Sequence, residues 1–238
     1  MKTIALFDID GTLTLPRHRI SNDMIDLLKQ LQTKMNIGVI GGSDLVKQKE
    51  QLGDVLDWID YSFSENGVVA YHHQTLIHQN NIRHIVNDDT INNFIDFCLH
   101  YIDKLDIPVK RSKFIECRTG MINISPIGRD CTQHERDEFD KYDQKHRIRQ
   151  TMVDVLKKKF GDIFTFAIGG QISIDVYPHG WDKTYCLTFL NDFNTIYFYG
   201  DKTEEGGNDY TLYCHPRVIG YHVDCPLDTY QFIKQLLL

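Results

Sequence analysis

The chain has 238 residues, 42% of them hydrophobic, and a formal net charge of −7. This length suffices for one large or two modest domains with separate cores. The acidic balance disfavours nucleic acid and anionic membranes as partners, and the lack of about 18 consecutive uncharged apolar residues excludes a membrane span.

The start of the chain leaves no room for a secretory leader, because Met1 is followed within three residues by an apolar run. We therefore expect a cytoplasmic protein. The six cysteines contain no C-x-x-C pair, which argues against a zinc ribbon or a disulfide framework.

The first half of the predicted α/β part alternates strands and helices. The apolar run TIALFDI (3–9) predicts a parallel strand buried on both faces. A helix capped by Ser21 is predicted over 21–35, a strand over 37–42, and a helix over 44–53 that ends at Gly53. This alternation is typical of an open α/β sheet.

A further strand of this sheet is predicted at TIYFY (195–199). Polar clusters occur at the ends of these three strands: Asp8, the segment 41–43, and Gly200 with Asp201. Parallel sheets bind ligands at the carboxyl ends of their strands. We therefore expect these three clusters at one edge of the sheet.

The pattern changes between residues 82 and 180. A helix is predicted over 90–105, two strands over 113–118 and 120–125, a helix opened by the capping box of Thr132 and Glu135, a helix over 148–160, and strands over 164–168 and 171–177. We interpret this segment as an inserted α+β unit. The predicted domains are therefore a catalytic core of 1–81 and 181–238 and a substrate-recognition cap of 82–180.

The sequence DIDGT places Asp8 and Asp10 where the first buried strand ends. Burying two carboxylates is costly unless a cation or hydrogen-bond donors compensate. An Asp-Gly turn with a helix cap is the simpler interpretation of the motif taken alone.

Four segments together resemble the motifs of the haloacid dehalogenase superfamily: DIDGT, GGS at 41–43, Lys183 and GDKTEEGGND. More narrowly, FDIDGTLTLPR, SENGVVAY, FIECRTGMINISPIGR and GGQISIDVYPHGWDKTYCL resemble the eukaryotic-type phosphomannomutases. The resemblance covers essentially the whole chain. It implies a Rossmann-like core with an inserted α+β cap.

The resemblance also implies residue roles in the core. Asp8 is the expected phosphoryl carrier and Asp10 the general acid and base. Ser43 and Lys183 are expected to hold the transferring phosphoryl group, although Ser43 alone would pass for a helix cap and Lys183 for a solvated residue. The expected cofactor is Mg²⁺, with Asp8, Asp10 through its backbone carbonyl, Asp201 and Asp209 as ligands.

In the cap, similarity assigns Ser173 and Asp175 to the sugar hydroxyls, and alternation along QISIDVY places both on one face of a strand. The phosphate that does not react is assigned to Arg118, Arg129 and Arg136 of the cap and Arg17 of the core, because guanidinium binds phosphate bidentately. Any one of these arginines, taken alone, would pass for a surface residue.

The implied activity is interconversion of mannose 6-phosphate and mannose 1-phosphate through an aspartyl phosphate, with hexose 1,6-bisphosphate as intermediate and activator. The implied context is GDP-mannose synthesis by a homodimer joined through the cap. Two alternatives stay open: a Mg-dependent sugar-phosphate phosphatase, and a protein that binds sugar phosphates without catalysis.

The sequence departs from the family at an auxiliary cation site near Tyr213. His215 and Val218 stand where the family commonly has aspartate and threonine. Neutral imidazole is a poor ligand for a hard cation, and valine has no side-chain oxygen. We therefore predict that this site is weak, absent or altered.

Overall fold

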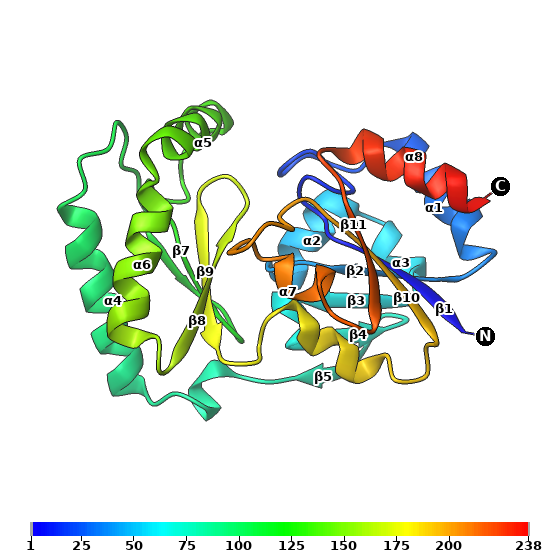
Figure 1. Cartoon of the computed structure of the whole chain (residues 1–238), viewed down its shortest axis with the longest axis horizontal. Coiled ribbons are helices and arrows are strands. Elements are labelled where there is room, and N and C mark those ends of the chain that lie inside the picture. The colour runs from blue at the N-terminus through cyan, green and yellow to red at the C-terminus, as the bar shows by residue number, and fades with distance from the viewer. Residues whose placement is uncertain (1, 238) are drawn as a thin grey trace. The chain divides into compact units, whose positions relative to one another are not determined.

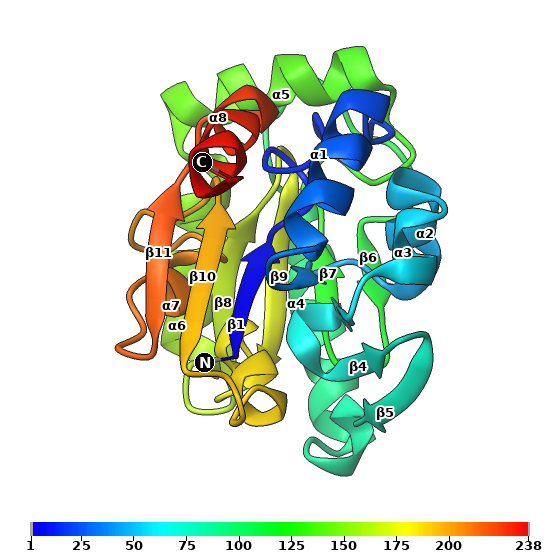
Figure 2. The same ribbon diagram turned by 90° about the vertical axis from the view of Figure 1, so that its right-hand side faces the viewer.

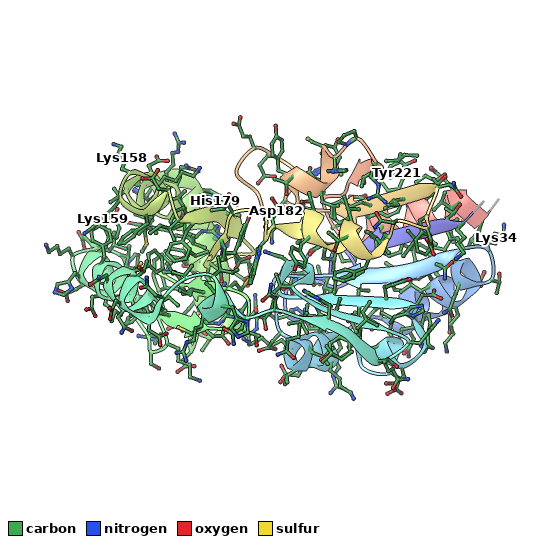
Figure 3. The ribbon with its side chains drawn as sticks, turned by 90° about the horizontal axis from the view of Figure 1, so that it is seen from below. Lys34, Lys158, Lys159, His179, Asp182 and Tyr221 are labelled. Atoms are coloured by element: carbon green, nitrogen blue, oxygen red, sulfur yellow. The ribbon has the colours of Figure 1, made fainter. Side chains whose placement is uncertain are left out.

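The computed structural model of the chain describes residues 2–237. It divides into two compact units, one made of the residues up to Gln79 and from Gly180 onward, the other of Asn80–His179. His179 and Asp182 lie on either side of the second crossing between the units (Figure 3). The predicted boundaries of the second unit, 82 and 180, lie two residues and one residue later than the observed ones. Met1 and Leu238, the ends of the predicted core, lie outside the described residues.

The first unit contains a seven-stranded sheet in the order β11-β10-β1-β2-β3-β4-β5 (Figure 1). Its strands are β1 (Thr3–Phe7), β2 (Asn36–Ile40), β3 (Tyr61–Ser64), β4 (Val69–His72), β5 (Thr75–Gln79), β10 (Thr195–Gly200) and β11 (Val218–His222). The five strands from β11 to β3 pair in parallel, and β4 and β5 add antiparallel hairpin strands at one side.

Both faces of this sheet are covered. Its helical elements are α1 (Asn22–Gln32), α2 (Leu45–Leu52), α3 (Val55–Trp58), α7 (Tyr210–Tyr213), α8 (Pro226–Leu237) and the 3₁₀ segments η1 (Glu65–Gly67) and η3 (Lys183–Phe189). Phe7 packs into the core formed with α1 and α8, which lie together on one face (Figure 2). Leu6 points to the opposite face and packs with η3 and α7. The first strand is therefore buried on both faces, as predicted.

The second unit contains an antiparallel sheet in the order β6-β7-β9-β8. Its elements are η2 (Ile82–His84), α4 (Asp88–Asp103), β6 (Ile115–Cys117), β7 (Ile122–Ile124), α5 (Gln133–His146), α6 (Ile148–Phe160), β8 (Phe164–Gly169) and β9 (Ser173–Pro178). Phe94 of α4 packs against the rings of Phe160, Phe164 and Phe166, which places the apolar sheet face against α4 and α6. The alternation of strand side chains leaves polar residues on the other face.

The predicted helix ends agree with the structure at several positions. Ser21 accepts the Met24 N–H at 3.2 Å, and Thr132 and Glu135 form the expected capping box. The first helix, however, ends at Gln32 rather than at residue 35. None of the helices within residues 2–237 combines the length and the apolar composition that a membrane span requires.

Candidate active site

Three carboxylates meet at the carboxyl edge of the parallel sheet. Asp8 follows β1, Asp201 follows β10 and Asp209 precedes α7. Because β1 and β10 are paired neighbours, with the Asp8 N–H donating to the Tyr199 carbonyl at 2.9 Å, their ends coincide. One carboxylate oxygen of each aspartate lies within 4.8 Å of the others.

Two glycines permit this close approach. A Cβ atom on Gly11 would lie 2.6 Å from the Asp201 Oδ2 atom, and one on Gly200 would lie 2.7 Å from the Asp209 Oδ2 atom. Gly11 also has a φ of +83°, which L side chains rarely adopt. The glycine of DIDGT therefore serves the packing of the carboxylates as well as the turn.

Lys183 is completely buried between two of these acids. Its Nζ atom lies 2.5 Å from Asp8 Oδ1 and 2.6 Å from Asp209 Oδ1. The other oxygen of Asp209 accepts the Lys202 N–H at 3.0 Å. The structure thus rules out the solvated interpretation of Lys183, since its ammonium group compensates buried negative charge.

The electrostatics of this cluster favour additional positive charge. Burial raises the pKa of Asp8 well above its ordinary value against the opposing effect of Lys183, and the charges of Asp209 and Asp201 raise it further. Burial, followed by the charge of Asp209, raises the pKa of Asp201 to about 6. For Lys183, burial lowers the pKa, but Asp209 and Asp8 outweigh it and the net shift is upward, so the lysine stays protonated.

The cluster fits a hard divalent cation. Its fully ionised form has three carboxylates and one ammonium group, which leaves two negative charges, and its donor atoms are oxygens of the kind that Mg²⁺ prefers. The carboxylate of Asp10 is not a member of this cluster. This agrees with a ligand role for Asp10 through its backbone carbonyl, which stays a prediction.

We expect Mg²⁺ to stabilise the protein more at about pH 7.5 than at about pH 5. The folded pKa of Asp201, about 6, exceeds its ordinary value of 3.8, so the metal-free folded state binds the extra proton. The contribution of Asp201 to the stability of the metal-free protein therefore falls as the pH rises through about 6, while more of its carboxylate becomes available to the ion. Thermal unfolding with and without Mg²⁺ at both pH values checks this.

Asp201→Asn is the control for this measurement, because asparagine cannot take up the proton and is a weaker ligand. The variant should lose most of the Mg²⁺-dependent rise in unfolding temperature at both pH values. An equal Mg²⁺ effect in the variant and the original protein would contradict the assignment of Asp201.

Asp10 is held by two donors on the same oxygen. Its Oδ1 atom accepts the Arg17 N–H at 2.8 Å and the Gln51 side-chain amide at 2.7 Å. Gln51 lies in α2 and also contacts the Thr14 hydroxyl at 3.3 Å. These contacts fix the direction of the Asp10 carboxylate.

Ser43 lies in the loop between β2 and α2. Asp44, not Ser43, caps α2, because its Oδ1 atom accepts the Lys47 N–H at 2.9 Å. The loop is tied to η1 by two backbone bonds, from Glu65 to Ser43 and from Asn66 to Gly41. The cap interpretation of Ser43 is therefore wrong, and its phosphoryl-binding role stays a prediction.

The polar face of the second unit brings predicted phosphate-binding arginines together. Glu116 Oε2 lies 2.9 Å from both Arg118 Nη2 and Arg129 Nε. Arg129 Nη1 also donates to the Asn123 side-chain oxygen and, at 3.2 Å, to the Ser173 hydroxyl. Arg129 is therefore linked to Arg118, another predicted phosphate ligand, through Glu116, and it directly contacts Ser173, a predicted sugar ligand.

Two further predicted residues belong to the same network. Arg136 of α5 donates through Nη2 to the Arg129 carbonyl at 2.8 Å. Asp175 Oδ1 accepts the Asn123 side-chain amide at 2.7 Å. Arg118, Arg129 and Arg136 thus form one network. The fourth predicted arginine, Arg17, belongs to the first unit, and its side chain is exposed.

Sequence reasoning did not identify three side chains that contact predicted site residues: Gln51, Glu116 and Asn123. The cross-strand register pairs Glu116 with Asn123 and Asn123 with Asp175, so Glu116, Asn123 and Asp175 lie in one row on one face of the sheet of the second unit. The polar Asn123 between Ile122 and Ile124 is a signal in the sequence that this strand carries a polar face. The sequence does not show that Glu116 and Asp175 lie beside Asn123, because this depends on the pairing of the strands.

The segment where we predict a weak, absent or altered auxiliary cation site follows α7. Here His215 Nδ1 accepts the Arg217 N–H at 3.2 Å, and the Val218 N–H donates to the His215 carbonyl at 2.9 Å. The imidazole is thus engaged by its own loop. That the cation site near Tyr213 is weak, absent or altered stays a prediction.

The solved structures with a similar fold include a nucleotidase and a phosphatase. An N-terminally truncated, IMP-bound IMP-nucleotidase from Plasmodium falciparum has a TM-score of 0.65 and 18% identity over 99% of this chain and 68% of that one. A trehalose-6-phosphate phosphatase from Aspergillus fumigatus has a TM-score of 0.54 and 14% identity over 99% of this chain and 92% of that one. These likenesses confirm the predicted haloacid dehalogenase fold.

Curated relatives of known sequence are much more similar to this chain than these solved structures are. A phosphomannomutase from Nicotiana benthamiana is 55% identical over 228 residues, 95% of this chain and 90% of the relative. One from Oryza sativa subsp. indica is 53% identical over 237 residues, 99% of this chain and 96% of the relative. The family model for eukaryotic phosphomannomutase matches residues 24–238. The chain therefore belongs to the eukaryotic phosphomannomutase family.

Proposed function

We propose that the protein is a phosphomannomutase that interconverts mannose 6-phosphate and mannose 1-phosphate. The main support is a family match over nearly the whole chain together with Asp8 at the strand end, paired with the buried Lys183. GDP-mannose synthesis, a cytoplasmic location and a homodimer joined through the cap belong to this proposal.

Asp8 is the proposed phosphoryl carrier. An Asp8 carboxylate oxygen attacks phosphorus, the bond from phosphorus to the sugar oxygen breaks, and an aspartyl phosphate forms. Lys183, within 2.5 Å of Asp8, keeps positive charge beside the reacting group throughout. Ser43 would hold a phosphoryl oxygen from the neighbouring loop.

Asp10 is the proposed proton carrier. Its Oδ1 atom accepts from Gln51 and from the Arg17 N–H, so we assign the proton to Oδ2. Asp10 would give this proton to the departing sugar oxygen and later remove one from the attacking hydroxyl. Gln51 is then a positioning residue for Asp10.

Asp8, Asp201, Asp209 and the backbone carbonyl of Asp10 would hold Mg²⁺. Bound there, the ion would neutralise negative charge on the transferring phosphoryl group. The protein's own contribution is the packing around Gly11 and Gly200, which holds the carboxylates within reach of one ion.

The second unit is proposed to choose the substrate. Arg118, Arg129 and Arg136, called the arginine cradle below, would bind the phosphate that does not react, together with Arg17. Ser173 and Asp175 would bind sugar hydroxyls. A hexose 1,6-bisphosphate formed at Asp8 would then exchange ends and return its other phosphate, which explains why the same bisphosphate would activate the enzyme.

A coupled assay on mannose 1-phosphate, with and without hexose 1,6-bisphosphate, tests the proposal. We expect formation of mannose 6-phosphate that depends on added bisphosphate and Mg²⁺. Release of inorganic phosphate without isomerisation would instead identify a phosphatase. Binding of the sugar phosphate without turnover would identify a non-catalytic binding protein.

A further inference from the structure

Glu116 is a carboxylate placed between two arginines of the cradle. Its Oε2 atom lies 2.9 Å from an N–H group of Arg118 and 2.9 Å from one of Arg129. The two arginine side chains are only 4% and 14% exposed. A single oxygen atom therefore accepts from two nearly buried guanidinium groups.

The sheet register explains this placement. Glu116 and Arg118 are two positions apart at the end of β6, so both side chains lie on the polar face. Asn123 lies opposite Glu116 on β7, and Arg129 returns to the same face from the loop beyond β7. The contact is thus built into the strand pairing.

Arg129 has other partners that fix its direction. It also donates to the Asn123 side-chain oxygen and to the Ser173 hydroxyl. Arg118 has a further contact, from Nη1 to the Met121 sulfur at 3.5 Å. What Glu116 adds beyond orientation is negative charge beside two like-charged groups, which would otherwise repel each other.

We propose that the negative charge of Glu116, acting through Arg118 and Arg129, limits the affinity of the cradle for phosphate. The inference rests on the proposed mutase function, in which the bisphosphate must leave the cradle to exchange ends in every cycle. Glu116 reduces the positive charge that a phosphate meets and stabilises the guanidinium groups when the phosphate departs. Binding energy that only stabilises a bound ground state slows turnover, so limited affinity raises kcat.

Glu116→Gln tests the charge, because the amide oxygen can still accept from Arg118 and Arg129. We expect the Kd for mannose 6-phosphate, measured by calorimetry with Asp8→Asn also present, to fall on the order of fivefold at low salt. We expect kcat of the variant with Asp8 intact to fall by a similar factor. The difference in Kd should shrink in about 0.5 M KCl, because salt screens charge and not shape.

Two variants serve as controls. Glu116→Asp keeps the charge but shortens the side chain, so it should not tighten binding. Glu135→Gln makes the same charge change in a glutamate paired with Arg111, outside the cradle, and glutamine preserves the capping box. It should leave Kd and kcat unchanged, and thermal unfolding verifies that each variant is folded.

An active wild type with unchanged or weaker binding in Glu116→Gln would overturn the inference and leave the mutase function intact. Equal tightening in Glu116→Asp would also overturn it, since geometry would then be the cause. Failure of the proposed function has a different signature, which is the absence of mutase turnover in the wild type itself.

Discussion

Asp8→Asn is expected to lower mutase turnover by at least about a thousandfold, because the amide cannot form the aspartyl phosphate. The substitution is nearly isosteric and removes a negative charge that burial already disfavours. We therefore expect the variant to fold and to bind mannose 6-phosphate. The coupled mutase assay and calorimetry measure the two properties separately.

Asp60→Asn is the matched control for this substitution. Asp60 is also buried in the first unit, but its carboxylate accepts from the Ile37 N–H and the Asn36 side chain, both at 2.8 Å. Its loss should lower stability while leaving turnover per folded molecule nearly unchanged. Retention of more than roughly a hundredth of turnover by Asp8→Asn would contradict the carrier role.

Local signals in the sequence were sufficient to predict most elements of the fold. The uninterrupted apolar run before Asp8 predicted a strand buried on both faces, and Ser21, Gly53 and Thr132 marked helix ends because capping is a local interaction. The four-residue helices α3 and α7 were not predicted, since so short a segment carries no periodic pattern.

The site was predictable only where a residue type is unusual for its place. Two acids ending an apolar strand are such a signal, and the family resemblance supplied their roles. The contacts of Gln51 with Asp10 and of Glu116 with Arg129 depend on tertiary packing, which no spacing in the chain reveals. Lys183 shows the same limit, since its sequence neighbours gave no indication that it is buried.

Lys183→Met is expected to lower the free energy of unfolding of the metal-free protein by about 3–5 kcal/mol near pH 7.5, because Asp8 and Asp209 lose the buried ammonium group that compensates them. The loss should shrink as the pH falls. Asp8 has a folded pKa above its unfolded value, so its folded state gains protons and relative stability at low pH. Urea unfolding at several pH values measures this.

Lys202→Met provides the comparison, because Lys202 Nζ lies 3.4 Å from Asp201 Oδ2 but is about a third exposed. Solvent screens such a pair, and we expect a loss below about 1 kcal/mol with little pH dependence. Similar losses in the two variants would mean that Lys183 does not compensate the buried acids. Phosphoryl transfer should also fail in Lys183→Met even where the variant is folded, since the same ammonium group stands beside the reacting carboxylate of Asp8.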